Sequence, residues 1–364
     1  MATSARAWPD FAIPPGELLS ETLETLGLSQ AELARRAGRP AQAINEIIRG
    51  AKEITPETAL QFERVLGVPA HVWTRLEADY RHNKARLEDQ ARLKGELPLV
   101  SRYPYAAMAR HGWVRRTRHV LEQLQELLRF FGVVSLKQVP TIEAAAFRRS
   151  RKVNASPEAL AAWLRQGERE AQALPVAKFS AQQVRAALPE LRSLTRRPPE
   201  EFEPRLRQLL SDAGLALVLL PHLPATGAHG ATRWLNPDKA LIHMTNRYRW
   251  ADVFWFSLFH EIGHLLLHDR SSVFIEDENG DQQEQELEHE ADRFATNELI
   301  PLTAFKVFVQ RPDHRTRAAV LEFAREIGVA PGIVVGRLHH DGHLPHSHLN
   351  DLRSRFAWAE ASHR

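Results

Sequence analysis

Two histidines four positions apart, His260 and His264, enclose Glu261 in the sequence HEIGH. Residues four apart lie on one face of an α-helix, so a helix here places two ring nitrogens on one ion. Apolar residues recur at helical spacing over 254–267, which predicts that helix. Glu261 then lies beside the ion, where its carboxylate can take a proton from a bound water. The pattern indicates a zinc site that hydrolyses peptides.

The third ligand of such a site must come from another segment. A catalytic zinc ion usually takes three protein ligands, and a chain without cysteine must supply them from His, Asp or Glu. As a helix, residues 287–295 bury an apolar stripe that Glu290 borders, whereas Glu288 and Asp292 are expected to point elsewhere. We therefore select Glu290. The geometric alternatives are His289 and Glu286.

Residues near the motif have roles that the sequence leaves open. Gly263 costs about 1 kcal/mol relative to Ala inside a helix, which indicates either close packing of another backbone or a tolerated weak point. His268 lies about 6 Å further along the axis than His264, which suits a packing or supporting role better than a ligand role. The candidate donors for an oxyanion are Asn246, Arg247, Tyr248 and His289.

Short apolar runs at 215–220, 231–235 and 240–244 have strand length, and a turn signal separates the last two. Helical patterns fill most of the remaining chain. The acidic stretch 276–288 lacks apolar periodicity and is expected to be a solvated loop. The predicted fold class is mainly α with a small β-sheet (α+β).

The expected organisation has four parts. They are an all-α helix-turn-helix domain with a C-terminal helix over 1–96, a helical linker region over 97–199, a zincin-like peptidase domain over 200–335 and a histidine-rich tail over 336–364. Gly342 and Pro345 interrupt the group of five tail histidines made by His339, His340, His343, His346 and His348, which favours a loop over a second metal site.

A helix-turn-helix pattern occupies the N-terminal part. Ser29 and Glu32 form a capping box, Gly38 ends that helix in a sharp turn, and a second helix is expected over 40–49. Gln and Asn can read adenine, and Arg can read guanine or phosphate. The residues expected to contact DNA are Gln30, Arg39, Gln42, Asn45 and Arg49. The alternative is a helical bundle that binds only protein.

Charge is distributed unevenly. Residues 1–80 hold 8 Lys/Arg against 11 Asp/Glu, which favours the protein-binding alternative, whereas residues 81–152 hold 16 against 6. The basic excess suits either solvated helix faces or a phosphate-contacting surface. No membrane-spanning apolar run and no secretion signal occur, so we expect a cytoplasmic protein without a membrane partner.

Several stretches of the C-terminal half resemble the ImmA/IrrE family of metallo-endopeptidases over about residues 200 to 310. They are Arg233-Trp234-Leu235, Phe254-Trp255-Phe256, 260–268 and 290–295. The resemblance implies Zn²⁺ bound by His260, His264 and Glu290, with Glu261 as the catalytic base. Members of this family are bacterial regulators that cleave or otherwise inactivate repressor or antitoxin partners. The resemblance therefore implies limited cleavage of a regulatory protein.

The resemblance also places the strand over 231–235 near the site. We expect Thr232, Arg233 and Trp234 there to hold an extended substrate by β-addition.

Over about residues 13 to 80 the sequence resembles the HigA branch of the Xre-type antitoxin repressors. The stretches that carry the resemblance are 13–17, 28–34, 44–50 and 54–60. The resemblance implies binding to operator half-sites as a dimer, and hence a homo-oligomer. Family members often have Ser or Thr where this chain has Arg39-Pro40, so one phosphate contact is in doubt.

Two functions use the same two domains. The first is a zinc endopeptidase tethered to DNA that cleaves a regulatory protein. The second is a toxin-antitoxin type transcriptional repressor whose peptidase-like domain senses a ligand or binds a partner without hydrolysis. The presence of Glu261 favours the first, because a purely structural metal site needs no general base.

Overall fold

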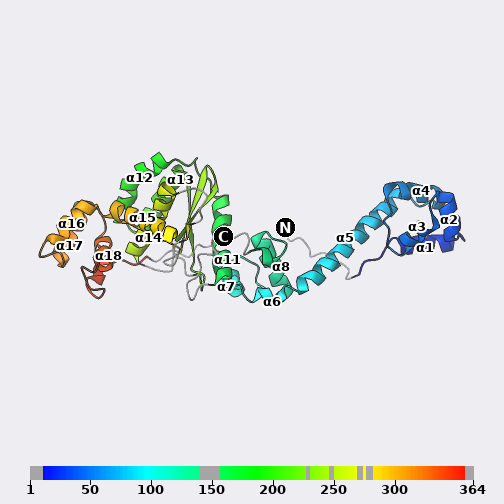
Figure 1. The fold of residues 1–364 in the computed structure, drawn as a ribbon, viewed down its shortest axis with the longest axis horizontal. Helices are drawn as coiled ribbons and strands as arrows, with labels where there is room; N and C mark the ends of the chain where they lie inside the picture. The colour runs from blue at the N-terminus through cyan, green and yellow to red at the C-terminus, as the bar shows by residue number, and fades with distance from the viewer. Residues whose placement is uncertain are drawn as a thin grey trace. The chain divides into compact units, whose positions relative to one another are not determined.

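The computed structural model describes residues 11–139, 156–226, 230–245, 250–268, 274–275 and 282–356. It divides the chain into two compact units, Met1–Leu97 and Pro98–Arg364, and Figure 1 colours them in chain order. Helices dominate the described chain and a small sheet lies in the second unit, which confirms the predicted α+β class. None of the described helices is long and apolar enough to cross a membrane.

The first unit consists of short helices followed by a long one, as predicted. Its elements are α1 (Gly16–Thr25), α2 (Gln30–Ala37), α3 (Ala41–Ile48), α4 (Pro56–Leu66) and α5 (Ala70–Lys94). Their apolar faces meet in one core. Its fully buried members include Leu19, Leu33, Ile44, Phe62 and Trp73.

The turn between α2 and α3 follows from local chemistry. Ser29 accepts a hydrogen bond from the Glu32 amide at 3.1 Å and so caps α2, as predicted. Gly38 ends α2 with a φ of 65°, a left-handed conformation that glycine adopts readily. On α3, Ile44 and Ile47 are buried, which leaves the opposite side of this helix outward.

The second unit continues the helical chain and then forms the sheet. Its helices before the sheet are α6 (Leu97–Val100), α7 (Tyr105–Arg110), α8 (Val120–Phe131), η1 (Leu136–Gln138), α11 (Pro157–Ala173), α12 (Ala181–Leu194) and α13 (Pro199–Asp212). The strands are β1 (Leu215–Leu220), β2 (Gly230–Asn236), β3 (Lys239–Thr245) and β4 (Phe274–Ile275). The remaining helices are α14 (Ala251–Leu267), α15 (Gln282–Leu299), α16 (Leu302–Gln310), α17 (Arg317–Ile327), α18 (Pro331–His340) and η2 (Asn350–Leu352).

These bounds confirm the three predicted strands and the predicted helix over 254–267. The expected loop over 276–288 is wrong from Gln282 onward, where α15 begins, and residues 276–281 lie outside the described residues. The first turns of α15 lack apolar periodicity, but the helix packs along α14. This packing stabilises it.

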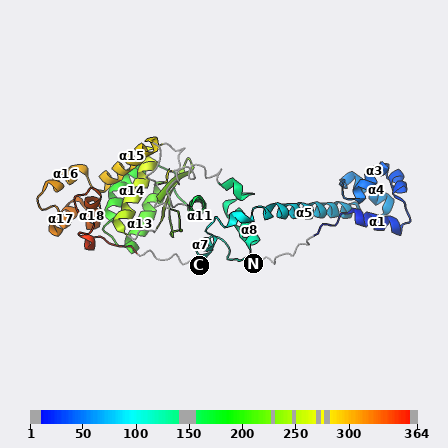
Figure 2. The same ribbon diagram turned by 60° about the horizontal axis from the view of Figure 1, so that its bottom comes forward.

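The sheet has the order β1-β3-β2-β4, with β1 parallel to β3 and the other pairs antiparallel. Side chains of a strand alternate between the two faces. Ile242 of β3 therefore joins the core shared with α13 and α14, whereas His243 faces α11. Figures 1 and 2 show α11 on one side of the sheet and α13 and α14 on the other.

The core of the second unit draws on segments far apart in sequence. The Phe202 ring of α13 lies 5.0 Å from the rings of Trp255 and Phe356, measured between centroids. Side chains of α12 and α18 join the same core. The regions predicted as a linker (97–199) and a tail (336–364) thus contribute to the core of the predicted peptidase domain.

A buried histidine joins α11 to the sheet. His243 is fully buried and stacks on Trp163 with 3.5 Å between ring centroids. Gly167 makes room for this ring, because a Cβ there would lie 2.4 Å from His243 Nδ1. Burial lowers the pKa of His243 to about 3, since the charged form would lose its hydration.

Replacing His243 by Phe should make the second unit less sensitive to acid. An unfolded histidine binds a proton below about pH 6.5, whereas folded His243 stays neutral until about pH 3. Because protons bind only the unfolded state between these values, the free energy of unfolding falls as the pH is lowered from about 6.5 to about 3. Between about pH 7 and pH 5 we expect wild type to lose about 2 kcal/mol more of unfolding free energy than His243→Phe. Urea unfolding at each pH measures this difference, and equal losses would contradict the assignment.

Candidate functional site

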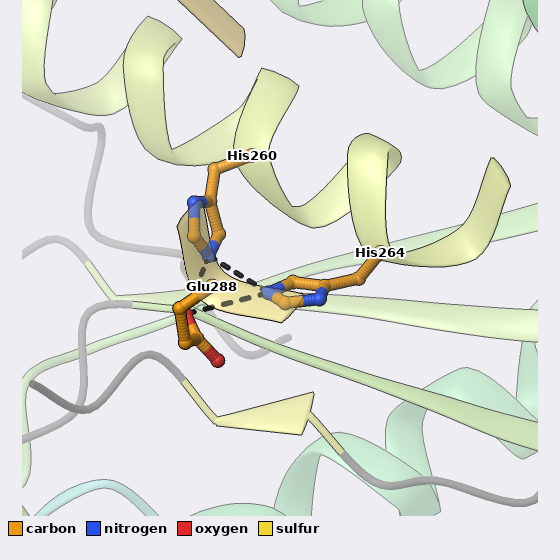
Figure 3. A group of neighbouring side chains, drawn as sticks. All are labelled: His260, His264 and Glu288. Carbon is orange, nitrogen blue, oxygen red and sulfur yellow. Dashed lines mark hydrogen bonds and ion pairs between the residues drawn. The ribbon is translucent and has the colours of Figure 1, made fainter. Parts of the chain in front are cut away.

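Helix α14 presents His260 and His264 on one side, as the four-residue spacing predicts. Both histidines are 1% exposed, and their Nε2 atoms lie 2.8 Å apart. Glu288 of α15 meets them, with its Oε2 at 3.1 Å from the Nε2 of His260 and 3.5 Å from that of His264. Figure 3 shows the three side chains converging. Among the described residues, His260, His264 and Glu288 form the group of His, Asp and Glu side chains whose ligand atoms lie close enough together to hold one metal ion.

The donor set suits a zinc ion. Two imidazoles and one carboxylate are ligands that zinc commonly takes in catalytic sites, and ligand atoms of a tetrahedral zinc site lie about 3.3 Å apart. The three separations here, from 2.8 to 3.5 Å, bracket that value. Each side chain offers one atom to the common point, which leaves a fourth position for water or substrate.

The other ring nitrogens of the two histidines have partners that fix the rings. Nδ1 of His260 lies 2.8 Å from Oδ1 of Asp292, so it carries the proton and donates to the carboxylate. Nδ1 of His264 lies 2.9 Å from Nδ1 of His268, and Nε2 of His268 lies 3.3 Å from Oε2 of Glu290. Such partners orient metal-ligating histidines and leave the Nε2 lone pairs directed at the ion.

The electrostatics of the group also favour a cation. Burial lowers the pKa of His264 to about 4, so this ring is neutral at pH 7, as a ligand must be. Burial raises the pKa of Glu288, but its hydrogen bonds with His260 and His264 outweigh this effect and bring the pKa to about 2. The group therefore combines neutral imidazole with an ionised carboxylate.

Close packing of α15 on α14 brings Glu288 to the histidines. Ala291 and Ala295 are fully buried in this contact. A Cβ at Gly263 would lie 3.3 Å from the Ala291 Cα and 3.0 Å from a ring carbon of Phe294. Gly263 thus meets a close backbone, the first of the two explanations that the sequence left open.

The structure corrects the prediction for the third ligand. Glu288 and Asp292 do not point elsewhere; both contact His260, whereas Glu290 lies beside His268. The predicted stripe consists of Leu287, Ala291 and Phe294, whereas Ala291 and Ala295 are the fully buried residues and Leu287 and Phe294 are only half-buried. The buried face of α15 is therefore turned toward Ala295, and Glu288 meets the histidines. The alternatives His289 and Glu286 are exposed.

Glu261 lies next to the ligand group and is 1% exposed. Its carboxylate rests against the backbone of Gly230, the first residue of β2. A Cβ at Gly230 would lie 2.3 Å from the Glu261 Oε1, so any larger residue would displace this carboxylate. No local pattern in the sequence marks Gly230 for this role.

The predicted substrate residues of β2 have partners within the chain. Thr232 is 1% exposed, Arg233 lies 3.8 Å from Glu168, and the Trp234 ring packs on Phe179. β4 pairs with β2 at Ala231 and Thr232. The expected β-addition is therefore wrong at Thr232, because β4 already occupies that edge, and it stays a prediction at Arg233 and Trp234.

Two further predictions concern residues beyond this group. Asn246, Arg247 and Tyr248, proposed as oxyanion donors, lie outside the described residues, and His289 is exposed. Of the five tail histidines, His339 and His340 belong to α18, so the expected loop is wrong for these two.

The residues predicted to contact DNA lie on and beside α3. Gln30 and Asn45 come together across the two helices, with the Asn45 Nδ2 3.4 Å from the Gln30 Oε1. Gln42 is exposed and donates to Glu46 at 2.9 Å. Arg39 donates to Gln61 of α4 at 2.7 Å, which directs part of its guanidinium away from the others. The exposed Arg49 follows the end of α3.

Comparisons with known proteins match both units. The family described as the IrrE N-terminal-like domain matches residues 245–339, and the helix-turn-helix family matches residues 19–73. Virulence-associated protein I of Dichelobacter nodosus is 37% identical over 81 residues, which are 22% of this chain and 75% of that protein.

Solved structures also match the N-terminal part. An addiction module antidote protein of the HigA family from Coxiella burnetii shares 30% identity over 23% of this chain and 94% of its own, with a TM-score of 0.22. The Pseudomonas aeruginosa antitoxin HigA, solved with the higBA promoter, shares 29% identity over 24% of this chain and 95% of its own, with a TM-score of 0.22.

Zinc affinity should separate the two glutamates of α15. Glu288→Gln removes a ligand charge and should weaken zinc binding by more than about 100-fold, whereas Glu290→Gln acts through His268 and should weaken it by about tenfold or less. Competition with a chelator at fixed pH measures both affinities. A larger loss in Glu290→Gln than in Glu288→Gln would assign the third ligand to Glu290 instead.

Proposed function

The chain belongs to the helix-turn-helix family of virulence-associated protein I and joins that domain to an IrrE N-terminal-like domain, and we propose that it is a DNA-bound regulator with zinc endopeptidase activity. The observation that carries the peptidase function is the convergence of His260, His264 and Glu288 beside buried Glu261. Limited cleavage of a regulatory protein, such as a repressor or antitoxin, is the activity that suits a DNA-tethered site.

His260, His264 and Glu288 would hold the zinc ion. When bound, zinc polarises the substrate carbonyl and lowers the pKa of water toward neutrality. Glu261 accepts a proton from the attacking water and later donates it to the leaving amine, as the peptide C–N bond breaks. Asp292 and His268 keep the two imidazoles oriented throughout. Because Glu261 is buried, bulk water does not reach its carboxylate.

DNA binding is proposed for the outward side of α3 and the start of α2. Gln30, Gln42 and Asn45 supply amide groups of the kind that read adenine in the major groove, and Arg49 can contact phosphate or guanine. The buried isoleucines of α3 hold this helix on the core and leave those amides outward. Operator binding as a dimer would make the protein a homo-oligomer.

Two variants test the role of Glu261. Glu261→Gln should bind zinc with an affinity near that of wild type and lose proteolysis by at least about 100-fold, since it removes only the base. Gly230→Ala should lose activity in the same way, because its Cβ would meet the Glu261 carboxylate. Zinc content and comparison of protein fragments in wild-type and Glu261→Gln cells are the measurements.

A matched control for Gly230→Ala is Gly95→Ala, which adds the same methyl group at an exposed glycine whose φ of −68° alanine adopts readily. The peptidase proposal fails if Glu261→Gln, loaded with zinc, produces the same fragments as wild type. That result would favour a domain that senses or binds a partner without hydrolysis.

The DNA-binding surface has its own test. Binding sites selected from random duplexes give the preferred operator, and titration at fixed salt compares variants on it. The double variant Gln42→Ala with Asn45→Ala should lose at least about 30-fold in affinity for this duplex, since two base contacts of about 1–3 kcal/mol each contribute at least about 2 kcal/mol together. Gln182→Ala, an exposed change in α12, should match wild type. Unchanged sequence preference in the double variant would exclude this surface.

A further inference from the structure

A pocket of about 300 Å³ lies close to the metal-ligand group, on the same pair of helices. Phe256 lines it from α14, four residues before His260, and Thr296 lines it from α15, four residues after Asp292. Four residues span about 6 Å of helix, so the pocket lies one turn from the ligand His260 on α14 and one turn from its partner Asp292 on α15. The Phe256 ring links the two places, with its centroid 6.3 Å from that of His260.

Most of the pocket wall is apolar. Its apolar residues are Val253, Phe256, Leu299, Ile300 and Ile333. Val253 and Phe256 are only half-buried, because part of each side chain faces this space. A pocket of this size and lining suits a large apolar group, and an aromatic side chain gains the most from such burial.

Two residues that line the pocket each carry a buried polar atom with no hydrogen-bond partner within the described part of the chain. They are Asp252, through its Oδ1, and His339, through its Nδ1, and the two residues are 8% and 4% exposed. Buried polar atoms are normally paired, so two unpaired ones in residues that line a pocket point to a ligand group that bonds them.

Both atoms are hydrogen-bond acceptors. The other carboxylate oxygen of Asp252 accepts from Arg353 at 2.7 and 3.0 Å, and Oδ1 of the same group can accept a further hydrogen bond. Nε2 of His339 donates to the carbonyl of His348 at 2.9 Å, so its Nδ1 carries a lone pair. The ligand group must therefore offer a donor.

Charge selects a neutral donor. Arg353 already balances Asp252, and Arg337, which pairs with Asp341, also lines the pocket. A lysine or arginine side chain would meet these two guanidinium groups, and an acidic side chain would bring acceptors to a wall with two unpaired acceptors. An indole N–H or a phenol O–H satisfies both requirements.

We propose, on the basis of the peptidase function proposed above, that this pocket binds a tryptophan or tyrosine side chain of the substrate beside the scissile bond. An extended peptide advances about 3.3 Å per residue. When the scissile bond lies at the ligand group, the side chain of a residue next to that bond can therefore reach a pocket one helical turn away. The N–H or O–H of its ring donates to Asp252 or His339. The pocket thereby sets the cleavage site within the regulatory protein.

Cleavage specificity tests the assignment. Full-length, zinc-loaded protein is incubated with amine-blocked peptides from a digested bacterial proteome, and new N-termini are identified by mass spectrometry. Tryptophan and tyrosine should be enriched about tenfold at one position beside the cleaved bonds. Val253→Trp fills the pocket and should abolish the enrichment while cleavage continues. Val307→Trp, at a 67% exposed position of α16, is the matched control and should cleave like wild type.

Binding without cleavage separates this proposal from the peptidase proposal. N-acetyl-tryptophanamide and N-acetyl-alaninamide are titrated by NMR into zinc-loaded Glu261→Gln protein, with and without Val253→Trp. The tryptophan amide should bind, and Val253→Trp should weaken it by at least about tenfold. Cleavage without aromatic enrichment, or equal binding of the two amides, overturns the pocket assignment. Absent cleavage with retained tryptophan amide binding overturns the peptidase function and supports the pocket.

Discussion

Close packing between α14 and α15 is the contact on which the site depends. Gly263 on one helix and Ala291 and Ala295 on the other lack the bulk that would hold the two backbones apart. Because the helices approach so closely, Glu288 reaches the Nε2 atoms of His260 and His264. The same approach continues one turn further and forms the wall of the apolar pocket. One helix pair thus positions both the metal ligands and the proposed substrate side chain.

The surrounding layers restrict the site further. The sheet supplies Gly230, whose missing side chain leaves room for the Glu261 carboxylate. Asp292 contacts Nδ1 of His260, and the His268–Glu290 pair contacts Nδ1 of His264. These contacts fix the orientation of the two buried imidazoles. Residues of and beside the two helices thus orient the ligands His260 and His264, and the sheet positions Glu261.

Local patterns in the sequence predicted most of the elements but not the geometry between them. The HEIGH helix, the three strands and the Ser29 and Gly38 signals follow from periodicity and capping, which act over a few residues. The rotation of α15 does not, because it depends on which of its residues fit against Gly263. Choosing Glu290 over Glu288 assumed a buried stripe of Leu287, Ala291 and Phe294, whereas Ala291 and Ala295 are the fully buried residues of this helix face. The pairing of β4 with β2 and the role of Gly230 are likewise contacts between distant segments.

The whole site depends on the binding of one zinc ion by His260, His264 and Glu288 together. A crystal structure of the zinc-loaded protein with anomalous diffraction at the zinc edge tests this binding. We expect one anomalous peak, coordinated by the two Nε2 atoms and a Glu288 oxygen, with Glu290 beside His268. A peak coordinated by Glu290 or His268 in place of Glu288, or no peak between the two histidines, would contradict it.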